Sequence, residues 1–173
     1  FRRVLFRSRL EAALQMDGVA VSVVNVGIGS ERTDLALKRL VKDVIAQKPV
    51  VVTIMYGTND SYVDQGKSAS RLALEEYRAN LGKLVDELRA AGITPVLMTE
   101  PRWGMAAKVN GLGEHPNLRL EQYMAACREV SKAKQVPLVD HFQHWTDAEA
   151  KGTDLGTWTT DQCHRSEEHT SEL

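Results

Sequence analysis

Four short apolar runs alternate with segments of helical periodicity along this chain. The run at residues 50–56, for example, begins with three consecutive valines and contains no charged residue. Nearly continuous apolar runs are typical of strands that are buried on both faces of a parallel sheet. The predicted strands are residues 19–27, 50–57, 94–101 and 136–142.

The segments between these runs have the i, i+3, i+4, i+7 spacing of amphipathic helices. Their apolar stripes are Leu37, Leu40, Val41, Val44 and Ile45, then Tyr77, Leu81, Leu84, Val85 and Leu88, then Leu120, Tyr123, Met124, Cys127 and Val130. Gly92 is predicted to end the second helix, because glycine is common just beyond a helix C-terminus. Alternating strands and helices predict right-handed βαβ units and one α/β domain with a parallel sheet.

Length and composition argue against a nucleic-acid-binding protein, a membrane-spanning protein and a disulfide-rich protein. A chain of 173 residues with 43% hydrophobic and 26% charged residues is typical of a single globular domain. The net charge of −1 gives no electrostatic footprint for nucleic acid. No apolar run approaches the ~20 residues of a membrane span. The two cysteines, Cys127 and Cys163, argue against a disulfide framework.

Polar residues follow the second predicted strand, in the sequence Gly57-Thr58-Asn59-Asp60. In open α/β sheets, ligands bind at the carboxyl edge, where this strand ends. The Asn59 side chain can donate hydrogen bonds and Gly57 allows a close backbone approach, so the pair can stabilise an oxyanion. The alternative for Asn59 is a turn residue that caps the next segment. Asp60 is predicted to be an N-cap or loop acceptor rather than a catalytic carboxylate.

A carboxylate stands three residues before an imidazole in Asp161-Gln162-Cys163-His164. An aspartate at this spacing suits a partner that orients a general-base histidine. The alternative is an exposed loop histidine without a catalytic role. The sequence therefore predicts a catalytic pair, Asp161 and His164, near the end of the chain.

These blocks resemble those of the SGNH (GDSL-type) hydrolases, in which an Asn block reads Gly-x-Asn-Asp and the last block reads Asp-x-x-His. Residues 25–33 resemble the family's Gly block, and Ser30 stands where family members commonly carry glycine. The resemblance covers roughly residues 19–164. It implies a three-layer, flavodoxin-like α/β fold and a serine ester hydrolase without a cofactor. The implied substrate is a small-molecule ester, either a short acyl ester or a carbohydrate acetyl ester.

The resemblance also implies a role for each candidate residue. Asn59 and the backbone of Gly29 and Ser30 would form the oxyanion hole, with Gly57 beside them. His164 would be the general base, and Asp161 would orient it.

One family block is missing from the sequence. The family nucleophile is a serine in Gly-Asp-Ser at the end of the first strand, and no Gly-Asp-Ser occurs here. Residues 1–8 and 165–173 resemble translated sequencing-adapter read-through, although ordinary charged termini are the alternative. We therefore expect a native domain at residues 9–164 that lacks the first strand and the last helix and is a poor esterase. Any signal peptide would lie upstream, so the sequence predicts neither the cellular compartment nor the oligomeric state.

The missing strand has a consequence for the sheet. In the family it lies between the strands that match residues 19–27 and 50–57. We expect either an open gap there or a surrogate strand at Val4-Leu5-Phe6. The surrogate conflicts with the roughly dozen residues that a parallel crossover needs.

Other readings of the sequence remain. Gly27-x-Gly29 precedes a helix, as in flavodoxin-like nucleotide or phosphate binders, but the third glycine and the Walker lysine are missing. A non-catalytic carbohydrate-binding relative is another alternative. His141 and His144 have a spacing that could hold zinc, but no paired cysteines accompany them, and no metal site is predicted.

Two further features concern the carboxyl edge of the sheet. The aperiodic segment 102–116 either lines a pocket with Arg102, Trp103 and His115 or forms a surface excursion around a packed tryptophan. Asp140 ends the last predicted strand and is expected to have a structural role.

Overall fold

Three parallel strands form the sheet of this protein. The computed structural model describes the backbone of residues 2–164 and the side chains from residue 9 onward. The α-helices and strands, in chain order, are α1 (Arg2–Met16), α2 (Thr33–Arg39), β1 (Val51–Met55), α3 (Thr58–Ser61), α4 (Leu74–Ala90), β2 (Thr94–Met98), α5 (Pro116–Lys134), β3 (Leu138–Val139) and α6 (His141–Ala150). The strand order is β1-β2-β3, with Val51 opposite Thr94 and Leu97 opposite Leu138. The predicted α/β fold with a parallel sheet is confirmed. The bounds of the last predicted strand, residues 136–142, are wrong: β3 is only Leu138–Val139, because Asp140 caps a helix that begins at His141.

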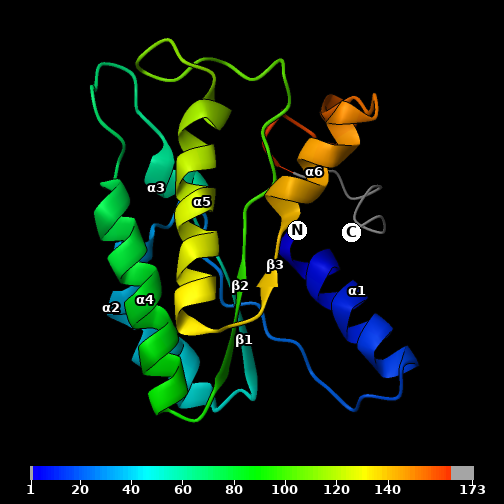
Figure 1. The fold of residues 1–173 in the computed structure, drawn as a ribbon. Coiled ribbons are helices and arrows are strands. Elements are labelled where there is room, and N and C mark those ends of the chain that lie inside the picture. The colour runs from blue at the N-terminus through cyan, green and yellow to red at the C-terminus, as the bar shows by residue number, and fades with distance from the viewer. Residues whose placement is uncertain (1, 165–173) are drawn as a thin grey trace.

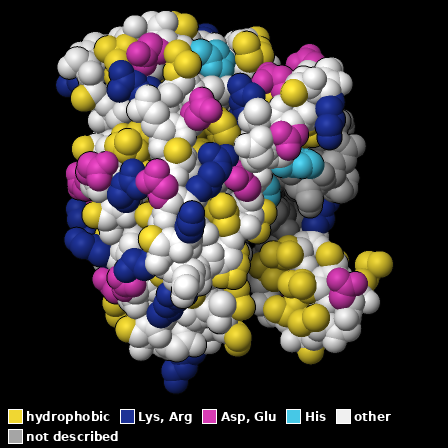
Figure 2. Space-filling model, in the orientation of Figure 1, with side chains coloured by type: hydrophobic (Ala, Val, Ile, Leu, Met, Phe, Trp, Pro, Cys, Tyr) yellow, Lys and Arg dark blue, Asp and Glu magenta, His cyan; other side chains and the backbone are white. Residues whose placement is uncertain are grey.

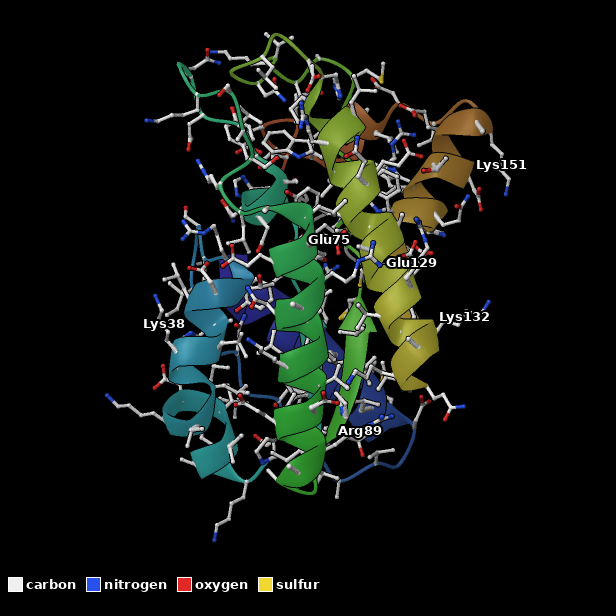
Figure 3. The ribbon with its side chains drawn as sticks, turned by 60° about the vertical axis from the view of Figure 1, so that its left-hand side comes forward. Lys38, Glu75, Arg89, Glu129, Lys132 and Lys151 are labelled. Atoms are coloured by element: carbon white, nitrogen blue, oxygen red, sulfur yellow. The ribbon has the colours of Figure 1, made fainter. Side chains whose placement is uncertain are left out.

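Helices α4 and α5 cover one face of the sheet, with α2 beside α4 (Figure 1). The apolar stripes that the sequence predicts on α4 and α5 are buried in the core. The rings of Tyr77 and Tyr123 meet between the two helices, with centroids 5.1 Å apart. Charged side chains such as Glu75 and Glu129 lie on the outer surface (Figure 3). Both helix predictions are confirmed, and the positive φ of Gly92 (74°) just beyond α4 agrees with its predicted role.

The first predicted helix is interrupted. Helix α2 ends at Arg39, and a π-helical turn (Leu40–Val44) and a 3-10 turn (Ile45–Gln47) follow. Because a π turn contains more residues than an α turn, it rotates the apolar stripe. Leu40 stays buried, whereas Val41 is 62% exposed, so the prediction that Val41 belongs to the core is wrong.

The first predicted strand does not form. Residues 19–28 have no regular secondary structure, and Val4-Leu5-Phe6 lies within α1, so the surrogate strand is also wrong. Val19 and Val24 are 48% and 60% exposed. An apolar run becomes a strand only when a neighbour supplies hydrogen-bond partners. Within residues 2–164, the sheet holds no strand on the outer side of β1.

One face of β1 is exposed. Val51 and Thr53 are exposed, whereas Ile54 is buried. The prediction of burial on both faces is therefore wrong for this strand. Figure 1 shows α1 on the other side of the sheet from α4 and α5, and Figure 2 shows hydrophobic side chains gathered over α1.

The carboxyl ends of the strands point to a single edge of the molecule. Helix α3, the loop after β2 and the segment after α6 gather at this edge (Figure 1). The candidate residues therefore come together from segments that are far apart in the sequence. None of the helices within the described part of the chain is long and apolar enough to cross a bilayer.

Candidate active site

Gly57 forms the turn between β1 and α3. Its φ of +144° is unfavourable for other residues. A Cβ atom at this position would lie 2.3 Å from Met124 Cε and 3.4 Å from Tyr77 Oη. The Tyr77 hydroxyl in turn donates a hydrogen bond to the carbonyl of Tyr56, at 2.8 Å. Core side chains thus fill the space beside Gly57, which shapes the turn that carries Asn59; a role in substrate binding stays a prediction.

Asn59 lies half-buried in α3. Its Oδ1 atom accepts a hydrogen bond from Arg71 Nη1, at 2.8 Å. Among the described residues, the structure records no partner for the Asn59 Nδ2 amide. The carboxamide therefore keeps its donor end available, as an oxyanion site requires.

Asp60 joins the Asn block to the Gly block. The side chain is fully buried, and its Oδ1 atom accepts hydrogen bonds from the Thr33 backbone N–H at 2.9 Å and from the Thr33 hydroxyl at 2.7 Å. Burial raises the pKa of the Asp60 carboxyl, and the hydrogen bonds from Thr33 offset this only in part. Because Thr33 begins α2, Asp60 serves as a structural acceptor for that helix, as the sequence predicts.

The Gly block contributes Glu31 to a buried ion pair with Arg39. Ser30 adopts a left-handed conformation, with φ of 62°, at the position where the resemblance expects glycine. The buried Glu31 carboxylate accepts two hydrogen bonds from Arg39, both at 2.6 Å, and one from the Tyr56 hydroxyl at 2.6 Å. Burial and the Glu31 charge raise the pKa of Tyr56. This cluster anchors the exposed backbone of Gly29 and Ser30 to the end of β1.

Sequence reasoning missed this Glu31 cluster. A glutamate directly after a glycine-containing turn, with an arginine eight residues later on the next helix, is the only local signal for it. The tyrosine partner, Tyr56, directly follows β1, and no local pattern links it to Glu31.

Asp161 and His164 form the pair that their spacing predicts. His164 Nδ1 lies 2.7 Å from Asp161 Oδ2, and the backbone N–H of His164 donates to Asp161 Oδ1 at 2.8 Å. Burial alone would raise the pKa of Asp161, but these hydrogen bonds outweigh it and lower the pKa. The side chains are 65% exposed for His164 and 49% for Asp161, so the imidazole is open to solvent. The catalytic role of the pair stays a prediction.

Gln162 holds this pair against the loop that follows β2. Its backbone carbonyl accepts a hydrogen bond from the Gly104 N–H at 2.8 Å, and its Oε1 atom accepts one from the Ala106 N–H at 3.2 Å. Its φ is 67°. A Cβ atom on Gly104 would lie 2.1 Å from Gln162 Oε1. Sequence reasoning missed Gln162, because its partners are more than fifty residues away along the chain.

Glu100, which follows β2, lies close to Gly57 of the Asn block and near Cys163 of the last block. Its Cγ atom lies 3.7 Å from the point where a Cβ on Gly57 would be. Burial raises the pKa of the Cys163 thiol to about 12, and the charge of Glu100 adds to this shift. Glu100 is therefore near both segments, and Figure 1 shows α3 and the segment after α6 at the same edge of the sheet.

The loop at residues 102–116 is fixed by polar contacts. The backbone N–H and carbonyl of Trp103 both bind the side chain of Asn117, at 2.8 and 2.9 Å. Arg102 pairs with Glu149 at 2.5 Å, and His115 Nδ1 accepts from the Asn117 N–H at the start of α5. Trp103 stacks on Tyr62, with ring centroids 5.9 Å apart. This arrangement favours the packed-tryptophan interpretation of the loop over the pocket lining.

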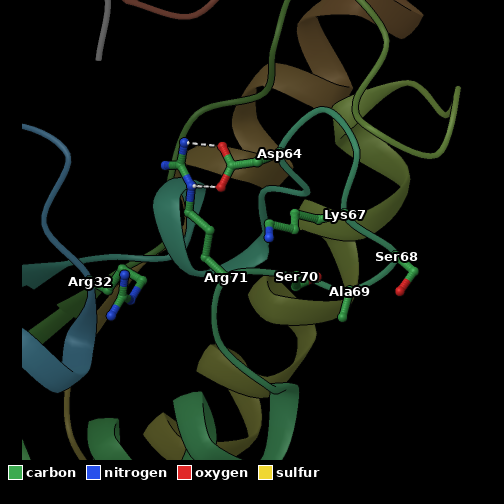
Figure 4. Close-up of a pocket in the computed structure, with 7 residues that line it drawn as sticks. All are labelled: Arg32, Asp64, Lys67, Ser68, Ala69, Ser70 and Arg71. Atoms are coloured by element: carbon green, nitrogen blue, oxygen red, sulfur yellow. Dashed lines mark hydrogen bonds and ion pairs between the residues drawn. The ribbon is translucent and has the colours of Figure 1, made fainter.

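A cavity of about 440 Å³ lies instead beside α3 (Figure 4). It is lined by Arg32, Asp64, Lys67, Ser68, Ala69, Ser70 and Arg71. Polar and apolar atoms contribute about equally to its lining, and three of these side chains are cationic. Sequence reasoning assigned no role to this segment.

The remaining predicted residues have local structural roles. Asp140 caps α6 and accepts two hydrogen bonds from Arg128, at 2.6 and 3.0 Å, in agreement with the predicted structural role. His141 is buried in the first turn of α6, whereas the exposed His144 stacks on Trp158, with ring centroids 6.2 Å apart.

The sequence as a whole matches a known family. Residues 3–168 match the GDSL-like Lipase/Acylhydrolase family. The chain belongs to this family. The predicted class, an SGNH (GDSL-type) hydrolase, is therefore confirmed, and with it the enzyme class of the family.

Relatives of this GDSL-family chain include proteins from bacteria and mammals. The chain is 34% identical over 154 residues to the uncharacterized lipoprotein YqeF of Bacillus subtilis (strain 168), covering 78% of this chain and 60% of that protein. It is 28% identical over 157 residues to the isoamyl acetate-hydrolyzing esterase 1 homolog of Rattus norvegicus, covering 83% of this chain and 62% of that protein. The chain thus spans about three fifths of the length of these relatives.

Solved structures of GDSL-type enzymes share the fold. The acetylxylan esterase Axe2 from Geobacillus stearothermophilus aligns with a TM-score of 0.77 and 23% identity, covering 96% of this chain and 75% of that one. A lipase/acylhydrolase from Enterococcus faecalis aligns with a TM-score of 0.74 and 25% identity, covering 98% of this chain and 78% of that one. The predicted flavodoxin-like SGNH hydrolase fold is therefore confirmed.

Proposed function

We propose that the protein is a serine-dependent ester hydrolase that acts on a short acyl ester or on an acetyl ester of a carbohydrate. The observation that carries the proposal is the hydrogen bond between His164 and Asp161, at 2.7 Å, in a chain of the GDSL family. The names of the relatives support a short acyl group, since they include an isoamyl acetate-hydrolyzing esterase homolog and an acetylxylan esterase.

In the proposed mechanism, His164 removes the proton from a serine hydroxyl, which attacks the ester carbonyl carbon. Asp161 accepts a hydrogen bond from the Nδ1–H of the imidazole, so the Nε2 atom acts as the base. The tetrahedral oxyanion accepts hydrogen bonds from Asn59 Nδ2 and from the backbone of Gly29 and Ser30. The C–O bond to the alcohol then breaks, and the imidazolium protonates the departing alcohol.

Water completes the reaction. His164 removes a proton from a water molecule, which attacks the acyl-enzyme and releases the carboxylic acid and the free serine. The exposure of His164, 65%, supports access of water and of a small ester from solvent.

The proposed mechanism requires a serine nucleophile. No Gly-Asp-Ser sequence occurs within the 173 residues. We therefore propose that these residues by themselves hydrolyse esters poorly. Oxyanion donors and binding alone give a residual acceleration of roughly 10³-fold over water in a serine protease.

An aryl-acetate assay on the purified chain tests this proposal. We expect turnover close to the buffer rate, and a strong gain when a segment that carries Gly-Asp-Ser precedes the chain. His164→Ala should abolish that gain. Two serines of the chain are tested as stand-ins for the nucleophile: Ser8, which closely follows Val4-Leu5-Phe6, and Ser30 of the Gly block. Turnover by the chain alone that survives Ser8→Ala but is lost with Ser30→Ala would identify Ser30 as the nucleophile.

The cavity beside α3 supports a second candidate function, binding of a phosphate or nucleotide without catalysis. The supporting observation is Lys67 in its lining, since the other two cationic residues, Arg32 and Arg71, pair with Asp34 and Asp64. Thermal-shift measurements distinguish this candidate from the hydrolase. Inorganic phosphate or nucleotides should raise the melting temperature if the cavity binds phosphate, whereas short-chain esters should raise it if the protein is a hydrolase.

A further inference from the structure

Arg71 lies beside the candidate oxyanion site and has several partners there. Its guanidinium makes a two-point ion pair with Asp64, through Nε at 2.9 Å and Nη2 at 2.7 Å (Figure 4). It also lies 5.0 Å from the centroid of the Tyr62 ring. The Arg71 backbone N–H donates to the Tyr62 carbonyl at 2.9 Å. A carboxylate, an aromatic face and a backbone contact therefore fix the position of this side chain.

The remaining edge of the guanidinium faces Asn59. Arg71 Nη1 donates to Asn59 Oδ1 at 2.8 Å. A carboxamide has an acceptor end and a donor end, and rotation about its last bond exchanges them. The guanidinium has donors only, so the exchanged orientation would place N–H groups against N–H groups. The contact with Arg71 thus favours one orientation, in which Nδ2 points away from Arg71.

We propose that Arg71 is a positioning residue that sets the orientation of the Asn59 carboxamide, so that its donor end faces the substrate. The consequence for catalysis rests on the proposed function. Without Arg71, the carboxamide populates both orientations, and the exchanged one presents an oxygen that repels an oxyanion. Loss of one oxyanion donor costs about 10²–10³ in kcat, which bounds the effect on turnover.

The orientation can be measured in the chain itself by NMR of the Asn59 side-chain amide. In Arg71→Met we expect the Asn59 amide order parameter to fall to the value of a free, exposed asparagine. Arg71→Lys should restore part of the order, because an ammonium group also donates to Oδ1. Arg78→Met is the matched control: Arg78 pairs with Glu129 on α5 and should leave the Asn59 amide unchanged.

The possible outcomes separate this inference from the proposed function. An Asn59 amide that is equally ordered in Arg71→Met and in the original chain overturns the inference. Should Arg71→Met fail to fold, Asp64→Asn provides the second variant, since it loosens the anchor of Arg71 and should also reduce the amide order. Unchanged order in Asp64→Asn and in Arg71→Lys would then overturn it.

Acetate tests the proposed function independently, because a carboxylate resembles the charge that an oxyanion site binds. A shift of the Asn59 Nδ2 amide signal on addition of acetate is expected. No shift, together with an amide order that depends on Arg71, would refute the oxyanion role of Asn59 and leave the positioning role of Arg71 in place.

Discussion

At the scale of single residues, the site depends on positions where both conformation and space are restricted. Gly57 is one of them, since its φ is +144° and a Cβ would lie 2.3 Å from Met124 Cε. We expect Gly57→Ala to lower the free energy of unfolding by on the order of 3 kcal/mol, from combined backbone strain and overpacking. Urea denaturation measures this loss.

Gly82→Ala is the matched control for Gly57→Ala. Gly82 lies within α4, and a Cβ there would make only an ordinary contact, 3.7 Å from Lys134 Cε. Alanine should therefore stabilise the protein by about 0.5–1 kcal/mol, as alanine in place of glycine does within a helix. Equal effects of the two substitutions would contradict the steric role of Gly57.

Asp60 makes stability depend on pH. Its folded-state pKa is raised by burial, so the stability that its protonated form contributes is complete below the unfolded pKa of about 3.9 and is lost as pH rises through the folded pKa. Asp60→Asn keeps an acceptor for Thr33 and removes the charge. We expect its stability relative to the original protein to improve as pH rises above about 4, as followed by thermal denaturation.

Asp60→Ala provides the contrast. It leaves the Thr33 N–H and hydroxyl without their acceptor, which costs about 1–3 kcal/mol for a buried polar group. This loss should persist across the pH range. A pH dependence of Asp60→Asn identical to that of the original protein would argue against a raised pKa of Asp60.

At the scale of elements, the Asp161–His164 segment depends on its contact with the loop after β2. Gln162→Gly permits the positive φ but removes the Oε1 acceptor of the Ala106 N–H. We expect hydrogen exchange at Ala106 to become about fivefold faster, which corresponds to one hydrogen bond of about 1 kcal/mol. Gln143→Ala is the control, since that side-chain amide binds only Asp147 within α6. If the Ala106 amide exchanged equally slowly in Gln162→Gly and in Gln143→Ala, the hydrogen bond from Ala106 to Gln162 would not hold the two segments together.

At the scale of the whole molecule, the sheet of residues 2–164 ends in an open edge at β1. Val50 and Val51 are 81% and 51% exposed beside it. Exposed apolar edge strands pair with other chains, and lysine on the edge prevents this. We expect self-association that rises with concentration and is reduced by Val51→Lys, measured by sedimentation velocity.

Val41→Lys is the control for the edge. Val41 is similarly exposed, at 62%, but it lies in the π turn after α2 rather than on a strand. If both substitutions reduced association equally, general surface hydrophobicity rather than strand pairing would be responsible.

The sequence alone determined the helices α4 and α5, the strands β1 and β2, the position of the short strand β3 and the pairing of Asp161 with His164. It did not determine the end of β3, because α6 begins at His141, inside the predicted strand. These features arise from short-range causes: helical periodicity, β-branched runs and a spacing of three residues. It also determined the family, because the order of the short Asn and Asp-x-x-His blocks is readable without coordinates.

Only the tertiary structure decided which apolar runs pair and how the site residues are held. Residues 19–27 have a strand-like composition, yet a strand needs a hydrogen-bonding neighbour, and no local pattern supplies one. The contacts of Arg71 with Asn59 and of Gln162 with the loop after β2 likewise join separate segments. They depend on where the fold brings the loops, and the periodicity of the chain holds no information about that.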